Sequence, residues 1–284
     1  MPLHLKKENE GIYILQLDDT NYIEFCPDRG GLITKWICNS ESILYFDKKR
    51  FLDKGKSVRG GIPILFPICG SLSGPNSIFN EDLELMPQHG FARDLKWEHV
   101  INIQNNSLNF FLVDNSTTKK YYPYKFEVDI RVTLGINKLD FEIIITNKSN
   151  TCMPINFGLH PYFNISSFNN IIFPNFPKIC QNQTNNTLVN TGDLLKNIHQ
   201  GIDLLMYSPG ESLFRDYEFK REILISHPYP FDINVIWSDP PRKMICIEPW
   251  TSPRNSLLDG IRRIDIAPCS SQRLFTSIKV KKFE

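Results

Sequence analysis

The sequence has no excess of charge of either sign, no long hydrophobic run and no closely spaced cysteines. Its 32 basic and 31 acidic residues give a net charge of +1, so nothing favours nucleic acid or an anionic membrane as partner. No apolar stretch approaches the length of a membrane-spanning helix. The first residues also lack the apolar core and cleavage site of a signal peptide. We therefore expect a cytoplasmic protein that binds neither nucleic acid nor membrane.

The seven cysteines are scattered, odd in number and never in the Cys-x-x-Cys spacing of zinc or redox motifs. Free thiols in a reducing compartment are the simplest interpretation, with disulfides or a metal site as the alternative. The composition, 41% hydrophobic and 22% charged, is that of an ordinary globular protein. A chain of 284 residues without an evident linker or repeat favours a single domain, 1–284.

Alternation of apolar and polar residues is the strongest structural signal. Residues 125–134 (KFEVDIRVTL) place every second, apolar side chain on one face, and residues 139–146 (LDFEIIIT) repeat the pattern after a turn. Together they predict a β-hairpin with one buried face. Further strands are expected at 12–17, 22–25, 32–38, 107–113, 233–237, 244–248 and 273–280. Asparagine-rich stretches at 102–109, 147–150 and 181–190 are interpreted as turns and loops, and one short helix is expected near 192–199. Many strands and few helices indicate an all-β sandwich or barrel.

Two glycine-containing segments carry arginines. In residues 58–67 (VRGGIPILFP), two glycines and two prolines fix an unusual backbone path beside Arg59. From the local sequence alone, a rigid core-crossing loop with a solvated arginine is the favoured interpretation. In residues 87–93 (PQHGFAR), a titratable imidazole, His89, lies four residues before Arg93, whose guanidinium can hold a hydroxyl, carboxylate or phosphate. A structural histidine beside a glycine is the alternative.

Two other segments offer an acid and a base. In residues 156–164 (NFGLHPYFN), His160 precedes a proline and lies among aromatic residues, which suit the apolar face of a sugar ring or an ordinary core. In residues 244–250 (MICIEPW), an apolar strand runs into Glu248. A carboxylate at the end of a buried strand is costly unless it is hydrogen-bonded, ion-paired or functional.

In this order, RGGIPILFP, QHGFAR followed by WE, GLHPYF and CIEPW resemble motifs of the aldose 1-epimerase (galactose mutarotase-like) superfamily. The closest likeness is to its glucose-6-phosphate 1-epimerase branch, the hexose-6-phosphate mutarotases, and it spans roughly residues 22–280. The resemblance implies a large, mostly antiparallel β-sandwich, the galactose mutarotase-like supersandwich, with few short helices. It also implies an isomerase that needs no cofactor or metal and interconverts the anomers of a hexose or hexose phosphate.

The resemblance also assigns residues. His160 and Glu248 match the family's catalytic histidine and glutamate, and His89 matches a second active-site histidine. Arg59 and Arg93 fall where the phosphate branch carries arginines that line the site. The candidate for the sugar-holding aspartate is Asp203, within the short segment GIDLLMY.

Anomer exchange fits these residues chemically, because it removes a proton from the C1 hydroxyl and delivers one to the ring oxygen. A carbohydrate-binding protein without turnover would use the same aromatic residues and arginines. A glycoside hydrolase would need two carboxylates, with Asp203 as partner of Glu248. The arginines suit a free hexose as well as a phosphate, and Trp250 at the edge of the cleft would narrow the space for a phosphate. We expect a monomer or weak homodimer.

Overall fold

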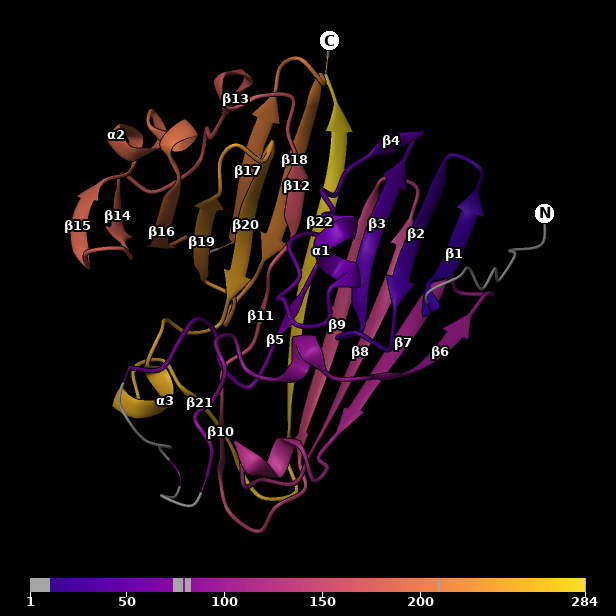
Figure 1. The fold of residues 1–284 in the computed structure, drawn as a ribbon, viewed down its shortest axis with the longest axis vertical. Helices are drawn as coiled ribbons and strands as arrows, with labels where there is room; N and C mark the ends of the chain where they lie inside the picture. The colour runs from indigo at the N-terminus through magenta and orange to yellow at the C-terminus, as the bar shows by residue number, and fades with distance from the viewer. Residues whose placement is uncertain (1–10, 74–78, 80–82, 209, 284) are drawn as a thin grey trace.

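The computed structural model describes residues 11–73, 79, 83–208 and 210–283, and two large sheets dominate it (Figure 1). The sheet that we call the β9 sheet has the order β13 (Ile171–Ile172), β17 (Gly210–Asp216), β18 (Arg221–His227), β22 (Ser271–Lys282), β9 (Lys138–Asn147), β8 (Phe126–Gly135), β7 (Ser107–Val113) and β6 (Glu98–Asn102). The other, the β20 sheet, has the order β15 (Thr187–Asn190), β14 (Ile179–Asn182), β16 (Ile202–Tyr207), β19 (Ile233–Ser238), β20 (Met244–Trp250), β11 (Gly158–Leu159) and β5 (Ile64–Leu65), and β12 (Tyr162–Asn164) also pairs with β20.

Smaller elements complete the fold. A four-stranded sheet contains β1 (Tyr13–Asp18), β2 (Asn21–Cys26), β3 (Leu32–Cys38) and β4 (Glu41–Ser42), and a two-stranded sheet contains β10 (Met153–Ile155) and β21 (Ile264–Ile266). The α-helices are short: α1 (Lys48–Leu52), α2 (Thr191–Leu195) and α3 (Ser256–Asp259). All pairings between these described strands are antiparallel. The predicted all-β, mostly antiparallel sandwich with few short helices is confirmed, whereas the single domain stays a prediction.

The predicted hairpin forms the centre of the β9 sheet. Strands β8 and β9 pair along their whole length, so that Ile130 lies opposite Ile143 and Val132 opposite Phe141. These four side chains are at most 2% exposed. Burying each of them contributes roughly 1.5–3 kcal/mol relative to leaving it in water. The alternation in the sequence therefore does fix which face of this sheet meets the core.

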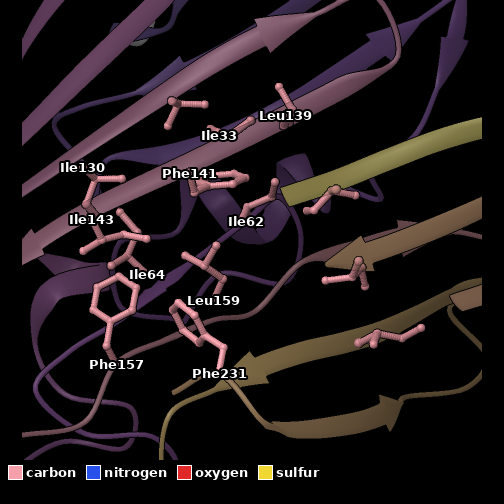
Figure 2. Packing of buried hydrophobic residues seen from close by; sticks show 14 of the residues in the cluster. Ile33, Ile62, Ile64, Ile130, Leu139, Phe141, Ile143, Phe157, Leu159 and Phe231 are labelled. Carbon is pink, nitrogen blue, oxygen red and sulfur yellow. The ribbon is translucent and has the colours of Figure 1, made fainter. Parts of the chain in front are cut away.

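The glycine- and proline-rich segment at 58–67 forms part of the core. Figure 2 shows Ile62, Ile64 and Leu159 packed among the buried side chains of the hairpin, including Phe141 and Ile143. The strand β20 contributes Ile245 and Ile247 to the same cluster. One hydrophobic core thus joins the two large sheets and supports the chain segments that carry the predicted motifs.

Some sequence interpretations were incomplete. The asparagine-rich stretch at 181–190 is mostly the hairpin of β14 and β15, and only residues 183–186 form its turn. Strand β16 was not predicted, because its consecutive apolar residues, Leu204 to Met206, interrupt the alternation of apolar and polar side chains. The expected helix near 192–199 corresponds to α2, followed by a 3₁₀ turn at Ile198–Gln200.

All seven cysteines are free thiols, five of them buried. Within the described ranges, no helix is both long and apolar enough to cross a membrane.

Candidate active site

A pocket on the β20 sheet brings together all six predicted site residues. Its lining consists of Arg59, Gln88, His89, Arg93, His160, Tyr162, Asp203, Val235, Trp237, Glu248, Trp250 and Arg254. These residues come from distant parts of the sequence, and most are polar or aromatic. The pocket therefore combines flat apolar surfaces with several hydrogen-bonding groups, a combination that suits a small polar ligand.

Glu248 is the deepest acid of the pocket. It lies on β20, whose seven residues are all buried, and its side chain is on the opposite face from the core residues Ile245 and Ile247. Glu248 is 1% exposed, and its Oε2 accepts a hydrogen bond of 3.1 Å from Trp250 Nε1. Burial, followed by the negative charge of Asp203, raises the pKa of the Glu248 carboxyl well above its ordinary value.

Trp250 was expected at the edge of the cleft, and this expectation was wrong. The residue is 1% exposed and lies on the same face of β20 as Glu248, two positions away. Its indole lines the pocket and donates a hydrogen bond to the Glu248 carboxyl group.

His160 lies directly against Glu248, with 3.3 Å between His160 Nε2 and Glu248 Oε1. Its backbone N–H donates to the carbonyl of Pro63, and its ring stacks on Tyr162 at 4.7 Å between centroids. Burial, followed by the positive charges of Arg93 and Arg59, lowers the pKa of His160 to about 3. The imidazole is therefore neutral near pH 7, beside a carboxyl group that favours its protonated form.

His89 lies at a turn where two successive residues have left-handed backbone angles. Its φ is +64°, and the next residue, Gly90, has φ +75°. The N–H of Gly70 donates to His89 Nδ1 at 3.1 Å, so in the neutral ring the proton is on Nε2. Burial and then the neighbouring His160 keep the pKa of His89 well below its ordinary value. His89 is thus a neutral hydrogen-bond donor in the pocket wall.

Two arginines supply positive charge. The guanidinium of Arg59 lies 5.3 Å from the centroid of Trp237 and donates a hydrogen bond to Ser57 Oγ. Arg93 Nε is buried, makes no hydrogen bond and is 3.6 Å from Asp94 Oδ2. Burial also lowers the pKa of Arg93. Both arginines therefore retain donors for a ligand.

Asp203 reaches the pocket from β16, where it lies opposite Trp237 of β19. Its Oδ1 accepts from Gln183 Nε2 at 2.6 Å, and its Oδ2 pairs with Arg254 Nη2 at 2.8 Å. Arg254 fits because Gly70 has no side chain: a Cβ there would lie 2.4 Å from Arg254 Cγ. The weakest residue match in the sequence is therefore located in the pocket with the others.

A sequence model described as aldose 1-epimerase matches residues 14–270. The chain belongs to the aldose 1-epimerase family. The resemblance predicted from the four motifs is confirmed for this family. For the branch, a curated relative from Escherichia coli K12, named "Putative glucose-6-phosphate 1-epimerase", is 23% identical over 220 residues, covering 75% of this chain and 69% of that protein.

Three further proteins extend the comparison. The plasmid-encoded LacX protein of Lactococcus lactis is 35% identical over 112 residues, 37% of either chain, so this chain spans little more than a third of its length. The solved structure of the Slr1438 protein from Synechocystis sp. PCC 6803 is 31% identical, with a TM-score of 0.91 over 99% of both chains. A galactose mutarotase related enzyme from Lactobacillus acidophilus shares the fold at 20% identity, with a TM-score of 0.76 over 95% and 97% of the two chains.

Several residues of this family member's pocket were not singled out from the sequence. Tyr162 and Gln88 lie within the recognised motifs, two residues after His160 and one before His89, so their position in the motif was an available signal. Arg254 and Trp237 lie outside the motifs, and only the pairing of β16 with β19 and the space at Gly70 bring them in.

Substitution of Gly90 tests whether close packing against Phe66 constrains the pocket wall next to His89. A Cβ on Gly90 would lie 2.0 Å from the carbonyl oxygen of Phe66, whereas Gly260, also at φ +75°, has open space around it. Gly260→Ala should cost about 1–2 kcal/mol from backbone strain alone. Gly90→Ala should exceed this cost by ~2 kcal/mol or more in the free energy of unfolding, measured by urea denaturation. Equal losses would show that the close approach to Phe66 is not a real constraint.

Proposed function

We propose that this protein interconverts the α and β anomers of a hexose by acid–base opening and reclosure of the sugar ring. The observation that carries the proposal is the distance of 3.3 Å between His160 Nε2 and Glu248 Oε1, deep in a pocket lined by polar and aromatic side chains. Membership in the aldose 1-epimerase family supports the same reaction. A binding protein without turnover has no use for a buried acid–base pair of this kind.

The proton count of the pair fits the reaction. Burial favours a neutral imidazole on His160 and a protonated carboxyl on Glu248, so the pair holds one mobile proton. Moving this proton from Glu248 to His160 creates a carboxylate and an imidazolium without exchange with solvent. The carboxylate is then a base and the imidazolium an acid, and the two are side by side.

In the proposed mechanism, Glu248 removes the proton from the C1 hydroxyl while His160 protonates the ring oxygen. The electron pair of the O1–H bond forms the carbonyl, and the bond between C1 and the ring oxygen breaks. Rotation about C1–C2 then presents the other carbonyl face, and the same two residues work in reverse as the ring closes. General acid–base catalysis of this type contributes roughly 10²–10⁴-fold.

The remaining side chains would hold the sugar while C1 rotates. His89 offers an N–H donor from Nε2, and Asp203 offers carboxylate oxygens whose orientation is fixed by Gln183 and Arg254. Such fixed partners keep the reacting atoms within reach of the acid and the base. The stacked rings of His160 and Tyr162 add a flat surface beside the site.

We further propose that the preferred substrate is a hexose 6-phosphate. The donors of Arg93 and Arg59 are incompletely used within the protein, and a phosphate would occupy them with charge-assisted hydrogen bonds. The name of the Escherichia coli relative supports this substrate class.

Removal of the proposed base, Glu248, or the proposed acid, His160, tests the function. Freshly dissolved α-glucose 6-phosphate and α-glucose are followed by polarimetry or by the NMR signals of the anomers, with and without protein. Glu248→Gln and His160→Asn should each lower kcat/KM by roughly 10²–10⁴-fold, because each removes one proton-transfer group. The exposed controls Glu142→Gln and His199→Gln should keep wild-type activity. Binding of the sugars with no acceleration by the wild type would identify a binding protein instead.

Removal of Arg93 tests the phosphate. A hydrogen bond to a charged group is worth about 1.5–3 kcal/mol, so Arg93→Ala should lower kcat/KM for glucose 6-phosphate by about 10–100-fold. Activity on free glucose should change much less. Arg273→Ala, on the exposed face of β22, is the matched control. An equal loss on both sugars would exclude Arg93 as a phosphate ligand.

With free glucose as the substrate, kcat/KM should not fall at the pH where an ordinary histidine titrates. The pair gains a second proton only when His160 protonates, below about pH 3, and loses its single proton only above the raised pKa of Glu248. We therefore expect kcat/KM to stay level through about pH 6.5, where an unperturbed imidazole titrates. Free glucose is used because a phosphate group itself titrates near pH 6. A tenfold fall per pH unit below about 6.5 would contradict the proposed protonation state.

A further inference from the structure

We propose that His160, Cys246 and Glu248 form a binding site for a soft divalent cation, with zinc as the expected ion, and that its occupation inhibits the enzyme. One ligand atom from each residue lies within 4.8 Å of the other two, and all three residues are buried. Cys246 has no role in the mechanism above. The metal would be an inhibitor that competes for the catalytic groups, not a cofactor.

Strand geometry brings the three ligands together. Cys246 and Glu248 are two positions apart on β20, so their side chains are on the same face. His160 lies two residues before Tyr162, the residue of β12 that pairs with Cys246. His160 Nε2 and Glu248 Oε1 are 3.3 Å apart. Two ligand atoms at about 2.0–2.1 Å from a tetrahedral zinc ion lie about 3.3–3.4 Å apart, so this edge already has the required length.

The ligand atoms have few competing partners. The neighbour of His160 Nε2 is the proposed co-ligand Glu248, and the imidazole is neutral, as a metal ligand must be. The Cys246 thiol contacts Met244 Sδ at 3.9 Å, which is a weak interaction between sulfur atoms. Zinc would replace the thiol proton of Cys246 and the carboxyl proton of Glu248, so that one Zn–S and one Zn–O bond form and two protons are released to solvent.

The ligand set also determines which ions bind. A thiolate, an imidazole and a carboxylate suit Zn²⁺, Cd²⁺ or Co²⁺, whereas Mg²⁺ and Ca²⁺ prefer sets of oxygen atoms. A bound ion would hold both the acid and the base of the proposed reaction, so inhibition should be competitive with the sugar. This inhibitory effect rests on the proposed function, but the binding of the ion does not.

Cobalt spectroscopy tests the site independently of activity. Titration of the wild-type protein with Co²⁺ should give the near-ultraviolet thiolate-to-cobalt charge-transfer band at one ion per chain, and Zn²⁺ should abolish it. Cys246→Ala should lose the band, and Glu248→Gln should weaken the binding of Zn²⁺ at least tenfold by calorimetry. The control Cys152→Ala, which removes an exposed cysteine, should behave as the wild type. Cobalt binding without the thiolate band would overturn the proposal.

Activity measurements give the second arm. Micromolar Zn²⁺ should inhibit mutarotation, a chelator should restore it, and Mg²⁺ should have no effect. Cys246→Ala should stay active and need at least tenfold more Zn²⁺ for the same inhibition. Equal sensitivity of this variant and the wild type would contradict the site. A thiolate–cobalt band in a protein that does not accelerate mutarotation would support the metal site and refute the proposed function.

Discussion

The burial of the Glu248 carboxyl group is the constraint on which the rest of the pocket depends. An isolated carboxylate at 1% exposure would cost several kcal/mol, so the protein must either neutralise the group or surround it with partners. It does both. The indole of Trp250 donates to one oxygen, and His160 lies 3.3 Å from the other. Burial also favours the protonated form of the carboxyl group, which places a proton next to the imidazole of His160.

This pair keeps its geometry because its supports belong to the core. The backbone N–H of His160 donates to Pro63, whose neighbours Ile62 and Ile64 pack in the hydrophobic cluster with the β8–β9 hairpin. Gly90 has no room for a side chain, because an added Cβ would lie 2.0 Å from the carbonyl oxygen of Phe66. A displacement of the core beneath the pocket would therefore move His160 and His89. The local sequence of the 58–67 segment favoured a purely structural loop. In the structure, Ile62 and Ile64 of this segment pack in the core and Arg59 lines the pocket.

The sequence predicted those parts of the fold and the pocket that leave a recognisable pattern in it. The hairpin of β8 and β9 has one wet and one dry face, so its alternation is visible in the sequence. Strand β16 has apolar residues at consecutive positions, so it shows no such pattern, and it was missed. The four motifs led to His160, Glu248, His89, Arg59 and Arg93 because their order in the chain resembles that of the aldose 1-epimerase family. Arg254 has no such context. It reaches Asp203 only because Gly70, far away in the sequence, leaves room for it.

The misjudged position of Trp250 shows the same limit in a single residue. Its place two residues after Glu248 was known from the sequence, but whether it faced the opening or the carboxyl group depended on β20 continuing past Pro249. Because the strand continues to Trp250, alternation places the indole on the face of Glu248 and Cys246. That same alternation puts a thiol next to a buried acid–base pair. A site that binds a proton tightly between nitrogen and oxygen ligands, with sulfur close by, has the chemistry of a soft-metal site as well.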